Sequence, residues 1–412
     1  MEKNHAPVVT PGRAMMKPRL NTSVEIKGTL RDVALPTLVR IPLDAKHKPV
    51  VKKKQVVARG QVVAETQTKN AYGVGYVHAT IDGAIEDITS SSIVIGPLPA
   101  PKEGESGPEL VHPEPHAGLG GLSGEELCRQ LLELGIDTFR FHPSRKLIVN
   151  GLNPEPGVMV SEQLLKDVPQ TLEAGIKILE RAVRPGTVIL AVAAGKSVTL
   201  HGCTTVQVSD LYPNTINPLV VYAATGSERP DNVDVISVSD LYRVGRVAET
   251  GLPLLDAVVT VGDQVFRVPT GMPVHDVLAA AGLDPAAYGK IGLDGPMCGY
   301  AVSDLSMGIP ENCTAVTLIP EGCFPEVGPN ACIHCGECVL VCPARIQPGM
   351  LSCNAEFGFF EETRIQHVDA CLECGMCTFA CPANRPVMQY IRLARQQLAA
   401  KDEFVGTCRL QD

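Results

Sequence analysis

The feature that most constrains this chain is a twelve-residue cysteine pattern that occurs twice. The first copy reads CIHCGECVLVCP, and the second copy, 39 residues later, reads CLECGMCTFACP. Both follow the spacing C-x2-C-x2-C-x3-C-P. The eight cysteines are Cys332, Cys335, Cys338, Cys342, Cys371, Cys374, Cys377 and Cys381.

This spacing is typical of cysteines that bind a cubane of iron and sulfide. Three thiolates at three-residue intervals surround one face of the cubane, whose irons take soft sulfur ligands. In chains with two such motifs, the fourth cysteine of each motif binds the other cluster. We therefore assign the ligands of one [4Fe–4S] cluster as Cys332, Cys335, Cys338 and Cys381. The ligands of the second are then Cys371, Cys374, Cys377 and Cys342.

A pair of zinc ribbons is the alternative interpretation, because zinc ribbons are also built from C-x2-C units. Zinc takes four ligands per site and gives no reason for a second C-x2-C step within each motif or for the final proline. The pattern therefore favours clusters that carry single electrons. The seven cysteines outside the motifs are expected to be small buried side chains, although Cys323 and Cys353 lie close enough to leave a role open.

Composition excludes several other classes of protein. A chain of 412 residues with 45% hydrophobic and 20% charged residues can fold into about two to four domains. A net charge of −9, 4% aromatic residues and no tryptophan argue against binding to nucleic acid. No apolar stretch reaches the ~18 residues needed to span a bilayer, and the start of the chain lacks the apolar core of a signal peptide. We expect a cytoplasmic protein with no transmembrane segment of its own.

The order of apolar patterns predicts a multidomain chain of the α/β and β classes. Alternating Val and Ile residues near the N-terminus indicate a small barrel or sandwich, and a Pro-, Gly- and Glu-rich linker separates it from an α/β pattern. The predicted parts are a tail (1–17), a barrel-sandwich domain (18–97), a linker (98–121), an α/β domain (122–253), a β-grasp module (254–320) and a two-cluster ferredoxin-like α domain (321–412).

Periodicity also predicts individual elements. Apolar residues at helical spacing predict helices over residues 124–134, 170–182, 274–281 and 387–400. Strands are expected over residues 146–149, 187–193, 206–210 and 234–240. A hairpin should turn at Gly262–Asp263.

Several stretches within residues 28–400 resemble the C subunit of the Rnf electron-transport complex. They include KLIVNGLNPEPG, YPNTINPLVVYAATGSERP, PTGMPVHDVLAAAGL and KIGLDGPMCGYAV. That family has a barrel-sandwich domain, a flavoprotein domain similar to the NADH-binding subunit of respiratory complex I, a soluble-ligand-binding β-grasp and a two-cluster ferredoxin domain. The resemblance implies the same architecture here, and it implies FMN and NADH as further ligands.

The family's flavin-binding residues are matched only in part. Its glycine-rich loop corresponds to Gly118, Gly120 and Gly121, but the chain continues as LSGEELCRQ without the family's Phe-Pro. Its Cys-Glu-Pro-Tyr turn corresponds to a segment in which Glu155 and Pro156 match and the flanking residues do not. The resemblance therefore implies Gly118, Gly120, Gly121 and Glu155 as the FMN-binding residues of a divergent site.

The resemblance implies an electron-transfer subunit on the cytoplasmic face of a membrane redox complex. Its partners would be the other subunits and a ferredoxin or flavoprotein, and no catalytic residue is assigned. The first alternative is an NADH dehydrogenase subunit that binds FMN and NADH and acts as an NADH:ferredoxin oxidoreductase. The second is a non-catalytic electron relay for a soluble reductase. Because the flavin motif is divergent, we predict little NADH:acceptor activity.

Overall fold

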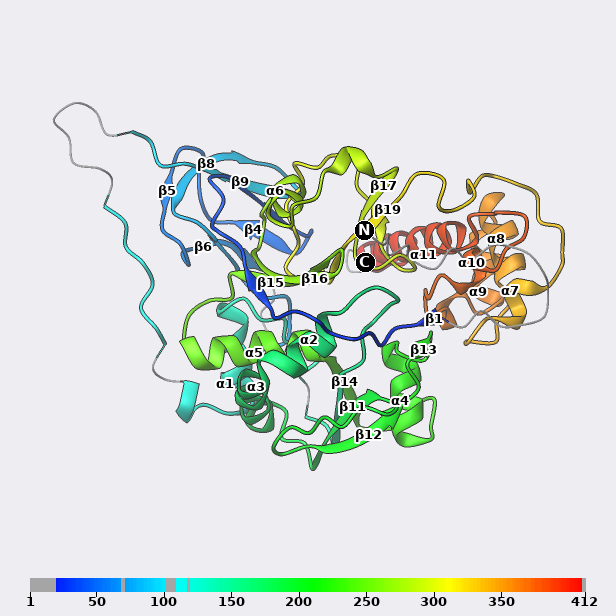
Figure 1. Ribbon diagram of the computed structural model, residues 1–412, viewed down its shortest axis with the longest axis horizontal. Coiled ribbons are helices and arrows are strands. Elements are labelled where there is room, and N and C mark those ends of the chain that lie inside the picture. The colour runs from blue at the N-terminus through cyan, green and yellow to red at the C-terminus, as the bar shows by residue number, and fades with distance from the viewer. Residues whose placement is uncertain (1–19, 68–70, 101–108, 117–118, 142, 410–412) are drawn as a thin grey trace. The chain divides into compact units, whose positions relative to one another are not determined.

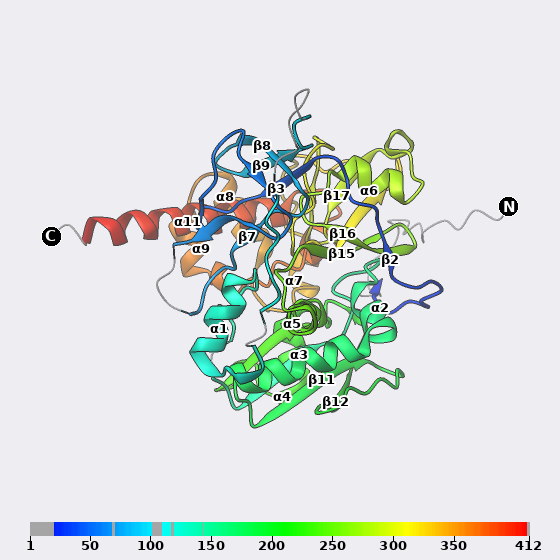
Figure 2. The same cartoon turned by 90° about the vertical axis from the view of Figure 1, so that its left-hand side faces the viewer.

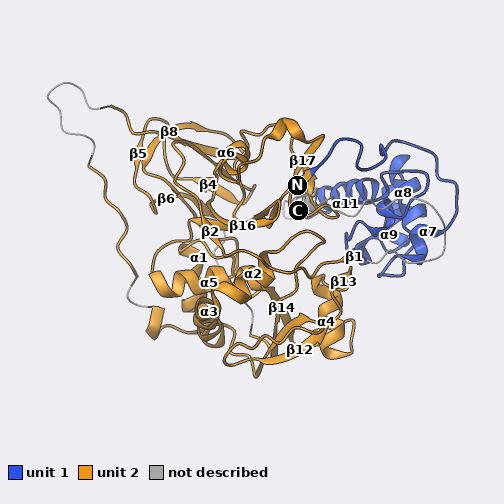
Figure 3. Ribbon diagram, in the orientation of Figure 1, with its two compact units in different colours: residues 1–20, 319–412 blue, residues 21–318 orange. Residues whose placement is uncertain are grey.

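The computed structural model describes residues 20–67, 71–100, 109–116, 119–141 and 143–409. It divides into two compact units, shown in Figure 3: residues 21–318, and residues 319–412 together with residues 1–20. The predicted tail, residues 1–17, lies outside the described residues.

The larger unit begins with two small antiparallel sheets (Figure 1). Their facing Val and Ile side chains, such as Val57, Val63 and Ile95, form one buried core. This arrangement agrees with the predicted small β structure. The first sheet has the order β3 (Val39–Pro42), β9 (Ser92–Gly96), β8 (Gly83–Ile88), β5 (Val56–Val57), and the second has the order β4 (His47–Pro49), β6 (Val62–Thr66), β7 (Val77–His78).

A four-stranded parallel sheet follows, with helices on both faces. Helices α3 and α5 pack side by side (Figure 2). Their Leu and Val side chains share a core with Val149 and Leu190. Helix α4 covers the other face through Val220, which packs with Ile148. The strand order is β12 (Thr204–Val208), β11 (Thr187–Ala193), β10 (Lys146–Asn150), β14 (Val233–Ser237), and the helices are α1 (Gly124–Glu133), α2 (Val160–Asp167), α3 (Pro169–Ala182), α4 (Asn217–Thr225) and α5 (Val238–Thr250).

The third sheet of this unit is mixed. Its hairpin closes with Val261 opposite Gln264, which confirms the turn predicted at Gly262–Asp263. An N-terminal strand pairs in parallel with the far side of the hairpin, through Arg31 and Phe266. The strand order is β18 (Tyr300–Ala301), β17 (Lys290–Leu293), β19 (Ala315–Ile319), β15 (Asp256–Val261), β16 (Gln264–Pro269), β2 (Arg31–Asp32), with helix α6 (Val274–Ala280) packed on the sheet.

The smaller unit is helical and carries both cysteine motifs. Leu351, Val368, Ile391 and Leu398 form its core, and Cys377 is part of that core. Its elements are α7 (Glu337–Leu340), α8 (Pro348–Glu356), α9 (Phe360–Ile365), η3 (Val368–Ala370), α10 (Met376–Phe379) and α11 (Val387–Arg409). The other short elements of the described chain are β1 (Leu20–Asn21), β13 (Leu211–Tyr212), η1 (Leu119–Gly121) and η2 (Pro285–Ala287).

One predicted strand is wrong in its second half. The strand expected over residues 234–240 ends at Ser237, where α5 begins. Ser237 and Asp240 form a capping box: the Asp240 N–H donates to Ser237 Oγ at 3.0 Å, and the Ser237 N–H donates to Asp240 Oδ2 at 3.1 Å. These bonds satisfy amides that the first helical turn leaves free, so they favour a helix over a longer strand.

Candidate functional site

The first motif forms a loop followed by a short helix. Gly336, with φ of +81°, precedes α7, so the chain can turn sharply between Cys335 and Cys338. The thiols of Cys332, Cys335 and Cys338 line a hollow, and its fourth thiol comes from Cys381 of the other motif.

The second motif repeats this arrangement. Gly375, with φ of +72°, precedes α10, and Cys371, Cys374 and Cys377 line a second hollow. Its fourth thiol is that of Cys342, from the first motif. The two hollows thus group the eight thiols in the same two sets as the predicted partition. The assignment of each thiolate to an iron atom stays a prediction.

The donor set fits a cubane, because four soft sulfur atoms surround each hollow and each can bind a different iron atom. Burial raises the pKa of the Cys374 thiol to about 11 and raises that of Cys377 further. Such thiols stay protonated until a metal binds, so loading the sites with iron must release protons. When bound, the clusters would supply one-electron chemistry that no side chain of this chain provides.

A buried arginine beside the first hollow was missed by sequence reasoning. Arg385 is 1% exposed and lines the hollow. Its guanidinium donates to Ser352 Oγ at 3.1 Å, to the Asn330 carbonyl at 2.8 Å and to Glu356 Oε2 at 2.6 Å, and it lies over the Tyr390 ring at 4.8 Å. A cation fixed here stabilises added negative charge on the neighbouring thiolate site. The only sequence signal is its place four residues after Cys381.

Two further features of α8 shape the first hollow. A Cβ added at Gly349 would lie 3.3 Å from Cys338 Sγ and 3.9 Å from Cys332 Sγ, so the lack of a side chain lets α8 approach the thiols closely. Cys353, which the motif spacing leaves out, makes a side-chain hydrogen bond with Cys332, and burial raises its pKa. A fifth thiol therefore lies beside the first hollow.

The second motif has a different polar environment. The Glu373 N–H donates to Cys371 Sγ at 3.4 Å. The Glu373 carboxylate pairs with Arg392 at 3.1 Å and with Arg395, and Arg395 also donates to the Cys371 carbonyl at 3.2 Å. These three charged side chains are about a third exposed. They tie α11 to the motif at the surface rather than placing a buried cation beside its thiols.

The predicted flavin-binding residues do not come together. Gly118 lies outside the described residues. Gly120 and Gly121 belong to η1, where the Gly120 carbonyl accepts a hydrogen bond from Arg181 near the end of α3. Because α3 leads into the first residue of β11, η1 lies at the amino edge of the parallel sheet.

Glu155 lies at the opposite edge, in the loop that follows β10. Its buried carboxylate accepts hydrogen bonds from the backbone N–H groups of Met297 at 2.6 Å and Cys298 at 3.2 Å. Burial raises the pKa of this carboxyl group, and the two N–H donors oppose that shift. Glu155 therefore holds the loop of residues 294–299 in place, and it does not form one site with the η1 glycines.

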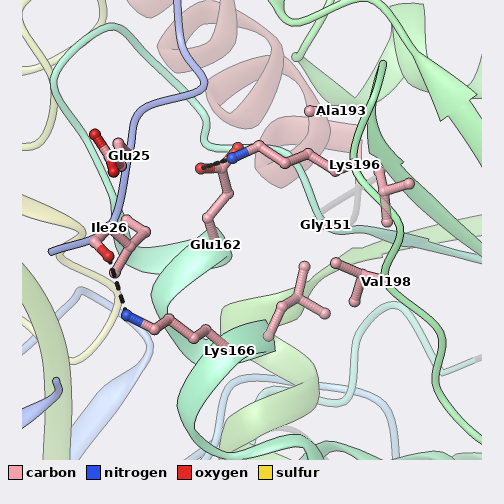
Figure 4. Close-up of a pocket in the computed structure, with 10 residues that line it drawn as sticks. Glu25, Ile26, Gly151, Glu162, Lys166, Ala193, Lys196 and Val198 are labelled. Atoms are coloured by element: carbon pink, nitrogen blue, oxygen red, sulfur yellow. Dashed lines mark hydrogen bonds and ion pairs between the residues drawn. The ribbon is translucent and has the colours of Figure 1, made fainter. Parts of the chain in front are cut away.

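A hollow of about 240 Å³ opens at the same carboxyl edge of the sheet (Figure 4). Gly151, after β10, and Ala193, at the end of β11, line it, and Lys196 extends toward Glu162 with an Nζ–Oε2 distance of 3.7 Å. Lys166 Nζ donates to the Ile26 carbonyl at 3.0 Å. Ligands of open parallel sheets bind at this edge, and the sequence did not predict the hollow.

The fold and the paired hollows define a protein with two 4Fe–4S-binding motifs. Comparison with protein families agrees, since a 4Fe-4S binding domain matches residues 324–347 and another matches residues 368–384. Among the described helices, none is both long and apolar enough to cross a bilayer.

Curated relatives confirm the resemblance to the Rnf C subunit. The chain is 28% identical to the C subunit of the ion-translocating oxidoreductase complex of Pseudomonas aeruginosa, over 68% of this chain and 39% of that one. It is 28% identical to the same protein of Edwardsiella ictaluri, over 72% and 40%. Its identity to the Rhodobacter capsulatus protein is 24%, over 94% and 83%. The match thus spans about two fifths of the length of the first two relatives.

Comparison with solved structures gives a match of low TM-score. A chain of the NAD+-reducing [NiFe]-hydrogenase in the H2-reduced state superposes with a TM-score of 0.40 and 17% identity, over 71% of this chain and 65% of that one. A TM-score of this size does not establish a common fold.

Proposed function

We propose that this chain is the iron–sulfur electron-transfer subunit of an Rnf-like redox complex and passes single electrons through two [4Fe–4S] clusters. The observation that carries the proposal is the grouping of eight thiols around two hollows, four to each. The similarity to the C subunit of ion-translocating oxidoreductase complexes supports assembly with other subunits. The cytoplasmic face of a membrane is the location that we propose for this assembly.

Metal analysis tests the proposal. Protein purified without oxygen should contain about eight irons and eight sulfides, as expected for two cubanes. Two zinc ions per chain with negligible iron would instead support the zinc alternative and end the proposal.

Replacing Cys381, the fourth cysteine of the second motif, tests which four thiols hold which cluster. In Cys381→Ala, EPR should show depletion of the cluster held by Cys332, Cys335 and Cys338, because Cys381 lines that hollow. Preferential loss of the cluster held by Cys371, Cys374 and Cys377 would show that the partition is wrong. Cys381 is a better test than Cys332, whose loss the neighbouring Cys353 thiol can offset.

An NADH-oxidising role is the second candidate, and the hollow at the carboxyl edge of the sheet favours it. The described η1 glycines and Glu155 lie at opposite edges of the parallel sheet. We propose the hollow beside Lys196 as the place for a flavin. Flavin analysis of the purified protein, with anaerobic addition of NADH, tests this candidate. We expect little bleaching of the cluster absorbance; rapid bleaching with bound FMN would favour the dehydrogenase. A non-catalytic relay would contain iron without flavin and would purify apart from membranes.

A further inference from the structure

The first hollow is the more accessible of the two. In the first motif Cys335 is exposed, and Ile333 is 62% exposed. In the second motif Cys374 and Cys377 are 6% and 5% exposed. We call the first hollow the open hollow. Oxidation of cysteine follows the exposure of the thiolate, so a ligand is more easily lost from the open hollow than from the covered one.

A fifth thiol, that of Cys353, lies beside the open hollow. Its side chain makes a hydrogen bond with the side chain of Cys332, one of the four cysteines that line the hollow. The metal site itself does not depend on Cys353. The four thiols and the match of a 4Fe-4S binding domain to residues 324–347 define that site without it. Cys353 therefore adds one sulfur atom to a site that already has four.

Helix α8 fixes the position of Cys353. Leu351 and Ser352 are fully buried, so this turn of the helix is held in the interior of its unit. Gly349 lies one turn earlier on the same face of α8, and a Cβ added there would lie 3.9 Å from Cys332 Sγ. Two positions of α8 thus approach the same sulfur atom. A helical cysteine has two common χ1 rotamers, so the Cys353 sulfur can change its position while the helix stays in place.

The second motif has no cysteine at the equivalent position. The residue 39 positions after Cys353 is Arg392 of α11, and the counterpart of Gly349 is Met388. Arg392 pairs with Glu373 at 3.1 Å, and Met388 lines the second hollow. Of two sites with the same cysteine spacing, only the more accessible one therefore has a fifth thiol at this position.

We propose that Cys353 is a substitute ligand of the first cluster and can bind the iron atom that Cys332 otherwise holds. In the exchange, the bond from iron to Cys332 Sγ breaks and a bond to Cys353 Sγ forms. The proton of the Cys353 thiol passes to the departing sulfur, and no electron is gained or lost. The proposal rests on the proposed function and adds a fifth residue to one of its two sites.

Iron content tests the substitution in protein purified without oxygen and without added small thiols. Cys332→Ala should keep about eight irons, because Cys353 completes the first site. The matched control is Cys371→Ala, at the same position of the second motif, where Arg392 replaces the fifth thiol; it should fall to about four irons. Cys332→Ala combined with Cys353→Ala should also fall to about four, and Cys353→Ala alone should keep about eight.

Alkylation identifies the ligand without using activity. Iodoacetamide added to the iron-loaded, unaltered protein should modify Cys353, whose thiol is partly exposed and binds no iron there. In iron-loaded Cys332→Ala, Cys353 should stay unmodified, because its sulfur is bound. Mass spectrometry of the peptides measures both. Eight irons with Cys353 still alkylated in Cys332→Ala would mean a different ligand, and four irons in that variant would refute the substitution.

The EPR signal of the second cluster shows whether a variant is folded. If Cys332→Ala lacks that signal, Cys332→Ser, which is closer in size, takes its place, and Cys332→Ser combined with Cys353→Ala is its control. Equal iron content in that pair would overturn the proposal. Unaltered protein without iron would end the proposed function, whereas eight irons there and four in Cys332→Ala would end only the substitute ligand.

Discussion

The two cysteine motifs share six of their twelve residues, yet they have different surroundings. The first lies beside the buried Arg385 and is open around Cys335. The second is covered by α11, and its charges, Glu373, Arg392 and Arg395, lie nearer the surface. The spacing of the cysteines sets which thiols meet, whereas the flanking helices set access and local charge. Two sites of one pattern can therefore have separate tasks.

The largest effect should come from removing one ligand of each hollow. Cys335→Ala and Cys374→Ala should each lower the iron content from about eight to about four, because each thiol belongs to one hollow only. Iron analysis with EPR of the reduced proteins measures this. Loss of all iron in both variants would mean that the two sites assemble as one and that the comparison fails.

The next largest effect is expected from replacing a charged side chain beside each motif, which should lower the stability of the fold. Arg385→Leu leaves the Glu356 carboxylate and the Asn330 carbonyl without their buried partner, so the free energy of unfolding should fall by about 3–5 kcal/mol. Glu373→Gln at the second motif breaks partly exposed ion pairs and should cost less than about 1 kcal/mol. Anaerobic urea unfolding of the iron-loaded proteins compares them. Equal losses would show that the two charge environments are equivalent.

Because the two cysteine sites differ in exposure, they should also lose iron at different rates. With a strong iron chelator, iron should leave in two phases of about four irons each. The faster phase should belong to the first motif, because Cys335 is exposed and Cys374 and Cys377 are buried. EPR of samples quenched between the phases identifies the remaining site. Earlier loss of the second site would contradict the assignment of the open hollow.

The smallest effect is expected from exchanging the residues that occupy the same position in the two motifs, Val339 in the first and Thr378 in the second. Thr378 Oγ1 accepts the Met388 N–H at 2.8 Å, at the start of α11, so Thr378→Val should cost about 1 kcal/mol. Its counterpart Val339 is 41% exposed, and Val339→Thr should change stability by less than about 0.5 kcal/mol. Thermal unfolding under anaerobic conditions measures both. A larger cost at Val339 would mean that this surface is already covered.

The sequence predicted best those features whose residues are close together in the chain. The cysteine spacing identified both motifs, and helical periodicity placed α1, α3 and α6 within one or two residues of their ends. Helical periodicity did not predict α5, because the apolar residues of DVISVSD continue past the end of β14 and made the strand look longer than it is. Ser237 and Asp240 carried the signal, as a serine followed three residues later by an acid.

Features made by distant residues could not be predicted in this way. The η1 glycines and Glu155 are 34 or more residues apart, and only the folded chain shows that they lie at opposite edges of the sheet, because Arg181 holds Gly120 near the start of β11 and Glu155 follows the end of β10. Arg385 carries no motif, and its importance comes from the burial of its guanidinium among Ser352, Asn330 and Glu356. The hollow beside Lys196 is likewise made by segments that meet only in the folded chain.

The pairing of β2 with β16 has a consequence for folding during synthesis on the ribosome. Arg31 bonds to Gln264, 233 residues further on. At ~5–20 residues per second, synthesis of the intervening chain takes roughly 10–50 s. Through that time the nascent N-terminal strand has no sheet to join, and the sandwich strands between them must fold first. The mixed sheet can therefore gain its β2 edge only after the hairpin of β15 and β16 has left the ribosome.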